Sequence, residues 1–182
     1  MSSPYLTMIK YDGEIKIAHI HWFNGYPENV GIRFLRFLRK DTCCLLRQYL
    51  HNYKILEESV YKQYLIYGFA PDEEALQRDY PSFVFEGGDI LLERLMSGSE
   101  VSSCYSIKYA YEGDICWAYM IDYDTMTFEI YKGFNREPLK PTERFFYDGQ
   151  RNGSLYPIRL MRSYHLSTLP TDKRFLSELE VE

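Results

Sequence analysis

The 182-residue sequence predicts an α+β fold, with a mostly antiparallel sheet of at least five strands and helices packed on it. Two pairs of strand-like runs predict the sheet, one pair near each end of the chain, because each pair is joined by a turn too short for parallel strands. Helical periodicity between these pairs predicts the cover of the sheet. A layered αββα-like sandwich is one arrangement of these elements. Without a repeat or a linker, residues 1–182 are expected to form a single domain.

The first strand pair surrounds Asp12-Gly13, two residues that tolerate the positive φ of a tight hairpin turn. Polar and apolar residues alternate from Tyr5 to Tyr11 and again from Glu14 to Trp22, as expected of strands. The second pair, Ile115 to Tyr123 and Met126 to Lys132, is rich in β-forming residues. These patterns predict two hairpins.

The chain between the hairpins reads mainly as helix. A helix capped by Asn29 is predicted to run to Lys40, followed by a second helix from Asp41 or Thr42. Further predictions are a helical or mixed segment over 55–67, one turn over 72–76, and a helix over 89–96 capped by Asp89.

After the second hairpin, prolines and glycines in 135–153 predict a long exposed loop with one strand over 144–147. A further strand is predicted from Tyr156 to Tyr164. Thr171 is predicted to cap a last helix, which buries Phe175, Leu176 and Leu179.

Composition limits the function classes. A net charge of −5 disfavours free nucleic acid as the main ligand, although direct nucleic-acid binding stays open. The four cysteines show no CxxC spacing, so no metal or other cofactor is predicted. No export leader and no apolar run of about 20 residues are found, so a cytoplasmic location without a membrane partner is expected.

Three clusters of residues offer chemistry. His19 and His21 lie two apart on a strand and suit either a metal site or a half-buried structural role, and the second is favoured. Asp122 and Asp124 are interpreted as turn residues. The only basic concentration suits either RNA or phosphate contacts or the solvated face of a helix; it comprises Arg33, Arg36, Arg39, Lys40 and Arg47.

Ser2 carries an alternative function. After removal of Met1 it would be an amino-terminal residue whose hydroxyl is a nucleophile and whose own amine is the base. The corresponding hypothesis is an amidohydrolase of the amino-terminal nucleophile type. A structural or oligomeric phage accessory protein is the other alternative, and no catalytic residue is assigned in the main interpretation.

Three stretches resemble a family of small uncharacterised proteins of bacteriophages and mobile elements, over residues 6 to about 176. They are Leu6 to Pro27 with its aromatic-Asn-Gly-Tyr-Pro loop, Cys116 to Asn135, and Ser163 to Pro170. In size and character the chain is also similar to anti-CRISPR proteins, which inhibit type II RNA-guided nucleases.

The resemblance implies a non-enzymatic inhibitor that binds a CRISPR effector nuclease–guide RNA complex and blocks DNA engagement or cleavage. Acidic and aromatic side chains would then contact the basic channel of the nuclease. The residues proposed for this contact are Trp22, Tyr26, Asp72, Glu73, Glu74, Glu178 and Glu180.

Overall fold

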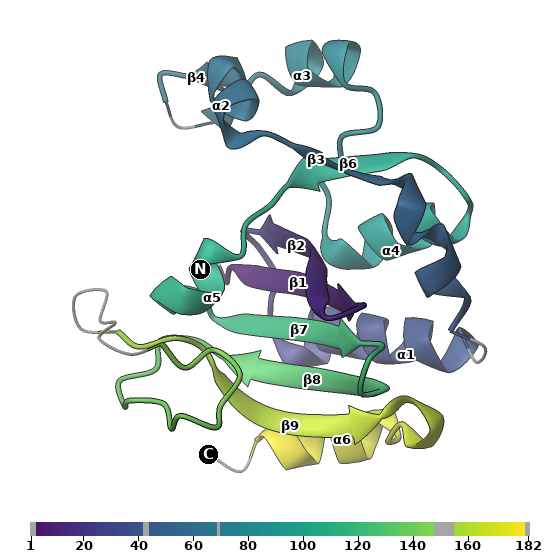
Figure 1. Cartoon of the computed structure of the whole chain (residues 1–182), viewed down its shortest axis with the longest axis vertical. Coiled ribbons are helices and arrows are strands. Elements are labelled where there is room, and N and C mark those ends of the chain that lie inside the picture. The colour runs from purple at the N-terminus through teal and green to yellow at the C-terminus, as the bar shows by residue number, and fades with distance from the viewer. Residues whose placement is uncertain (1–2, 42–43, 69, 148–154, 181–182) are drawn as a thin grey trace.

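The computed structural model describes residues 3–41, 44–68, 70–147 and 155–180 and has the predicted α+β fold (Figure 1). Its centre is a five-stranded sheet with the order β2-β1-β7-β8-β9. The bounds are β1 Tyr5–Tyr11, β2 Glu14–His21, β7 Trp117–Asp122, β8 Thr127–Lys132 and β9 Arg159–His165. All neighbours in this sheet are antiparallel except β1 and β7, which are parallel.

Both predicted hairpins are confirmed. Asp12 and Gly13 join β1 to β2 with φ values of 54° and 76°, the left-handed geometry that a two-residue turn needs. The second turn joins β7 to β8, and Asp122 Oδ1 accepts hydrogen bonds from the amides of Asp124 and Thr125 at 2.9 and 3.2 Å. The interpretation of Asp122 as a turn residue is therefore correct, although this side chain also makes contacts outside the turn.

One face of the sheet is covered by α1 Ile32–Lys40, α4 Gly88–Met96 and α6 Asp172–Leu179 (Figure 1). Alternate residues of the central strands point to this side, and their rings pack on the helices. Phe34 lies 5.4 Å from Tyr119, and Phe175 lies 6.2 Å from Phe128, measured between ring centroids. Each such fully buried side chain contributes about 1.5–3 kcal/mol to folding.

The opposite face is covered by α5 Lys108–Glu112 and by the chain that follows β8. The described part of the predicted exposed loop is in fact partly core, since Leu139 and Phe145 are buried. No strand forms over 144–147; Phe145 packs instead on Tyr131, with 5.2 Å between the ring centroids. Among the described residues the other two sheets have two strands each, so the layers are not those of an αββα sandwich.

A smaller unit projects beyond the β2 edge of the sheet (Figure 1), and we call residues 53–85 the outlying lobe. Parallel strands β3 Tyr53–Leu56 and β6 Val101–Cys104 connect it to the rest of the molecule. It contains α2 Glu58–Tyr61, a 3₁₀ turn, the short hairpin of β4 Leu65–Ile66 and β5 Ala70–Pro71, and α3 Glu73–Asp79. The mixed segment predicted over 55–67 corresponds to β3, α2, the 3₁₀ turn and β4.

Several helix starts differ from prediction. A π-helical turn, Pro27–Gly31, precedes α1 and begins after Tyr26, so Asn29 is not the cap. Left-handed Cys44 interrupts the chain, and a 3₁₀ helix, Leu45–Asn52, replaces the predicted α-helix. Helix α4 starts after Gly87 instead of Asp89, whereas Thr171 does cap α6. In the described part of the chain, no helix has both the length and the hydropathy to cross a membrane.

Candidate functional site

The outlying lobe has a small hydrophobic core of its own. Leu56, Leu76 and Phe83 are buried in it, and the Tyr61 ring stacks on Phe83 with 5.7 Å between centroids. Two further interactions tie the lobe to its surroundings, namely the Phe83–Ser102 bridge and the ion pair of Glu58 with Lys108 of α5 at 3.1 Å. The lobe is thus a packed projection whose outer surface faces away from the main sheet (Figure 1).

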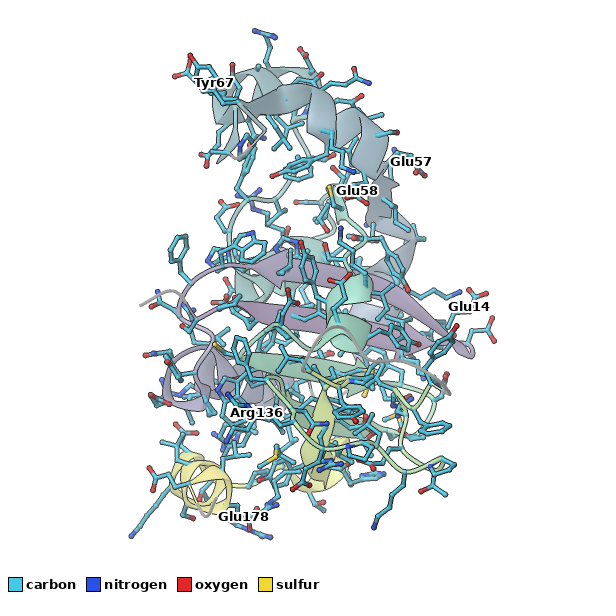
Figure 2. All side chains as sticks on the ribbon, turned by 90° about the vertical axis from the view of Figure 1, so that its left-hand side faces the viewer. Glu14, Glu57, Glu58, Tyr67, Arg136 and Glu178 are labelled. Carbon is cyan, nitrogen blue, oxygen red and sulfur yellow. The ribbon has the colours of Figure 1, made fainter. Side chains whose placement is uncertain are left out.

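Tyr67 stands at the outer end of the lobe (Figure 2). It follows β4, and its side chain is 92% exposed, next to Ile66 at 49%. Tyr67 and Gly68 have φ values of 52° and 76°, so the chain reverses here through left-handed residues. A bulky residue is uncommon in that region of backbone space, where glycine and asparagine are preferred. Folding alone therefore gives no reason for a tyrosine at this tip.

The lobe carries a net negative charge. Its segment 53–85 has six acidic and three basic residues, a net charge of −3 out of −5 for the whole chain. The acidic residues are Glu57, Glu58, Asp72, Glu73, Glu74 and Asp79. All but Asp72 are exposed.

These carboxylates differ in what they already bind. Asp72 caps α3, because its Oδ1 accepts a hydrogen bond from the Ala75 amide at 3.0 Å. Asp79 pairs with Arg78, and Glu58 pairs with lysines, and these contacts lower the pKa of both carboxyls. Among the described residues, Glu73 and Glu74 form no ion pair and remain open to a partner.

The two predicted aromatic anchors lie elsewhere, on the loop after β2. Trp22 is 49% exposed, and its ring meets Tyr109 of α5 edge to face at 5.7 Å. Tyr26 is 41% exposed, and its carbonyl accepts bonds from the Asn29 and Val30 amides. The loop is held against the start of the chain, since a Cβ on Gly25 would lie 2.6 Å from the Ser3 carbonyl oxygen.

Glu178 and Glu180 lie on or next to α6, at the opposite end of the molecule from Tyr67 (Figure 2). Glu178 accepts bonds from Arg174 and from the Tyr164 hydroxyl, at 2.6 and 2.8 Å. Its carboxylate is therefore engaged within the fold. The predicted contact residues thus fall into three separate places, and only Asp72, Glu73 and Glu74 share the lobe.

The basic face of α1 is paired within the chain. Arg33 meets Asp89 of α4 at 3.1 Å, and Arg36 and Arg39 both bind Asp172 of α6, at 2.7 and 2.6 Å. These arginines link α1 to its neighbours, while Lys40 is exposed at the helix end. Neither interpretation of this face foresaw the pairing, and a phosphate would have to compete with three carboxylate contacts. The predicted RNA or phosphate contact stays a prediction.

His19 and His21 both point to the helix-covered face of the sheet. The Nε2–H of His19 donates to the Glu86 carbonyl at 2.8 Å, and burial lowers the pKa of His19 to about 4. His21 is half-buried, and its ring lies 5.6 Å from that of Tyr5. In the described ranges, no three His, Cys, Asp or Glu side chains come together to suit a metal ion.

Next to these histidines lies a polar cluster at the start of α4. The Gly88 amide donates to the Tyr5 hydroxyl at 3.1 Å, and burial together with the Asp89 charge raises the pKa of Tyr5. Thr7 Oγ1 and Asp89 Oδ1 are buried there without a protein hydrogen-bond partner. The Thr7 hydroxyl sits where a Cβ on Gly88 would be, so side chains fill this space tightly.

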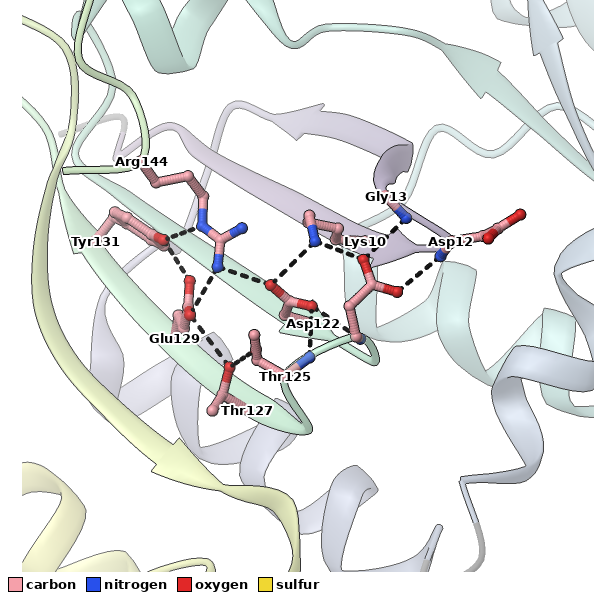
Figure 3. A network of polar contacts seen from close by, with 10 residues as sticks. Lys10, Asp12, Gly13, Asp122, Thr125, Thr127, Glu129, Tyr131 and Arg144 are labelled. Carbon is pink, nitrogen blue, oxygen red and sulfur yellow. Dashed lines mark hydrogen bonds and ion pairs between the residues drawn. The ribbon is translucent and has the colours of Figure 1, made fainter. Parts of the chain in front are cut away.

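A second polar network lies on the other face of the sheet, where both hairpin turns meet (Figure 3). Arg144 donates to Asp122, Glu129 and the Tyr131 hydroxyl, at 2.7, 2.9 and 3.1 Å. It thereby fastens the chain after β8 to the sheet. Tyr131 in turn donates to Glu129, and burial beside that carboxylate raises the pKa of Tyr131.

The same network ties the two turns together. Lys10 bridges Asp122 and Asp124, and Asp124 also accepts the amides of Asp12 and Gly13, at 2.8 and 3.0 Å. Asp122 is fully buried, yet its carboxylate faces both Lys10 and Arg144. Every charge here has a partner of opposite sign, so the network holds the two turns and the chain after β8 together.

The lobe tip was missed at the level of sequence. Tyr67 had one local signal, its place beside Gly68 a few residues before Pro71, which marks a turn. Its near-complete exposure depends on how the short elements of the lobe pack. Ser2, the nucleophile of the alternative hypothesis, lies outside the described residues.

Compared with known proteins, the chain matches no family model, no curated protein and no solved structure.

Proposed function

We propose that this chain is a non-enzymatic binding protein of a bacteriophage or mobile element that inhibits a host RNA-guided CRISPR effector nuclease. It acts in the cytoplasm of the bacterial host, on the nuclease–guide RNA complex. Binding blocks DNA engagement or the conformational change that precedes cleavage. The sequence resemblance described above suggests this partner.

The observation that supports the proposal is the outlying lobe. A projecting unit with net charge −3 and unpaired carboxylates complements a basic nucleic-acid channel and speeds encounter with it. Its tip carries an exposed tyrosine, a residue type enriched in interface hot spots. Glu73, Glu74 and Tyr67 are thus the residues we expect at the contact.

The experiment is co-elution of the purified chain with a panel of type II effector nucleases loaded with guide RNA. A complex should appear in gel filtration, and cleavage of target DNA should fall as the chain is added. Light scattering on the chain alone should show a small species instead of a large assembly. If the chain binds none of these complexes and leaves cleavage unchanged, the proposal is wrong.

A further inference from the structure

The outlying lobe combines two kinds of group that a nucleic-acid strand also presents, an aromatic ring at the turn of the β4–β5 hairpin and carboxylates after its base. Tyr67 offers a flat aromatic ring that is 92% exposed. Five residues further along the chain, Asp72 begins a run of three acidic residues at the start of α3. Grooves for single strands use the matching pair of features, basic side chains for the phosphates and planar groups that stack on the bases.

The position of Tyr67 on the lobe favours insertion of its side chain into a groove of a partner over packing of the whole lobe against a flat surface. The lobe extends away from the main sheet in Figures 1 and 2, and Tyr67 lies at its far end. Ile66 adds apolar surface at the end of β4, on a backbone fixed by pairing with Ala70. Because β4 and β5 are already paired, Ile66 has less backbone freedom to lose on binding, which suits it to be part of an anchor.

The acidic surroundings narrow the choice of partner. An anionic membrane surface would repel the lobe. A second copy of this chain offers a poor site on α1, because Arg33, Arg36 and Arg39 are already paired with Asp89 and Asp172. Charge complementarity therefore points to a different protein with a basic surface.

We infer that Ile66 and Tyr67 anchor this chain in a basic groove of a partner protein, a groove that otherwise holds a nucleic-acid strand. Glu73 and Glu74 face the basic rim of that groove and steer the approach, while the Tyr67 ring occupies a position used for base stacking. The identity of the partner in this inference rests on the proposed function, since a CRISPR effector nuclease has such a groove.

The test compares association and dissociation rates on an immobilised type II nuclease–guide RNA complex. Tyr67→Ala should dissociate about 10 to 100 times faster, because anchor residues act mainly on the dissociation rate. Glu73→Lys/Glu74→Lys should associate about ten times more slowly at low salt, because rim charges act mainly on encounter. Tyr67→Ala should melt like the wild type, since this side chain is exposed, and Glu73→Lys/Glu74→Lys should melt slightly lower, because positive charges near the start of α3 oppose the helix dipole.

Glu93→Lys/Asp114→Lys is the matched control for charge. It changes the net charge by the same amount at exposed positions outside the lobe. Its association rate should stay within about twofold of the wild type if the lobe directs the encounter. Equal slowing of both double variants would contradict the steering role of Glu73 and Glu74.

The outcomes separate this inference from the proposed function. If the wild type binds the nuclease and both lobe variants bind equally well, the inference is wrong and the proposed function stands. If the wild type binds no nuclease, the proposed function fails, and the same variants are used in a pull-down from host lysate. Proteins that are retained by the wild type, lost with Tyr67→Ala and displaced by single-stranded DNA support the inference.

A pull-down without such proteins overturns it. So does a dimer of the chain that light scattering detects and that Tyr67→Ala removes, because the tip would then contact a second copy.

Discussion

Carboxylates at two places in this molecule have opposite surroundings. Where the hairpin turns meet, Asp122 and Glu129 are buried, and each contacts a cation or a hydroxyl. In the outlying lobe, Glu73 and Glu74 are exposed and form no ion pair among the described residues. The fold depends on the first pair, because removing one partner of a buried charge leaves the other uncompensated. The second pair costs the fold little and can be used by a partner.

From this contrast we expect the largest change in the free energy of unfolding when Asp122 is substituted. Asp122→Ala should lower the free energy of unfolding by about 2–3 kcal/mol, because it removes a buried acceptor of two turn amides and one of the two carboxylates that Lys10 and Arg144 each bind. Urea unfolding monitored by circular dichroism measures this change. Asp122→Asn should lose less, since its side-chain oxygen can still accept the two turn amides.

Glu74→Ala is the matched control in the lobe and should change stability by no more than about 0.5 kcal/mol. Equal losses for Asp122→Ala and Glu74→Ala would remove the distinction between paired and unpaired carboxylates.

A second, smaller effect is the pH dependence of stability, which we expect from a histidine of the central sheet. His19 is buried and neutral, with its pKa lowered from 6.5 to about 4. Below pH 6.5 the unfolded chain binds a proton at this histidine that the folded chain does not. The contribution of neutral His19 to the free energy of unfolding is therefore complete above pH 6.5 and is lost as the pH falls toward 4. The free energy of unfolding should fall by about 2 kcal/mol between pH 7.5 and 5.

His19→Gln keeps a side-chain donor for the Glu86 carbonyl but cannot titrate. Its urea unfolding should therefore vary much less with pH over that range. A variant as pH-sensitive as the wild type would show that other groups cause the loss.

The sequence predicted the elements that depend on local chemistry. Asp12-Gly13 specifies a turn by its φ preference, and Thr171 caps α6 through a bond to the nearby Arg174 amide. Alternation in 115–132 was enough to predict β7 and β8. Such signals need only a few neighbouring residues, so they survive in any tertiary context.

Features that depend on distant residues were not predictable. The parallel pairing of β1 with β7 joins residues more than 100 positions apart, and no turn signals it. Arg144 was assigned to an exposed strand because nothing local shows that it reaches Asp122 across 22 positions. The lobe consists of elements of two to seven residues, too short for a periodic pattern. Among the candidate contact residues, Glu73 and Glu74 stand out in the sequence by charge, whereas Tyr67 does not.

Within the lobe, neighbouring acidic residues should differ by a smaller amount. Asp72→Ala should lower the free energy of unfolding by about 1 kcal/mol, because it removes the cap of α3. Glu73→Ala should cost about 0.5 kcal/mol or less, the usual contribution of a negative charge near a helix start. Thermal melts of the two variants measure the difference. The reverse order would mean that Glu73 has a structural contact that its exposure does not indicate.

The smallest expected effect has the opposite sign. Tyr67 holds a left-handed φ of 52° that asparagine adopts with less strain, and its side chain is 92% exposed. Tyr67→Asn should therefore raise stability by about 0.5 kcal/mol, or 1–2 °C in Tm, while it removes the proposed anchor. A lower Tm would show that Tyr67 supports the lobe core. A higher Tm combined with faster dissociation would show that this position serves binding at the expense of folding, unlike Asp122.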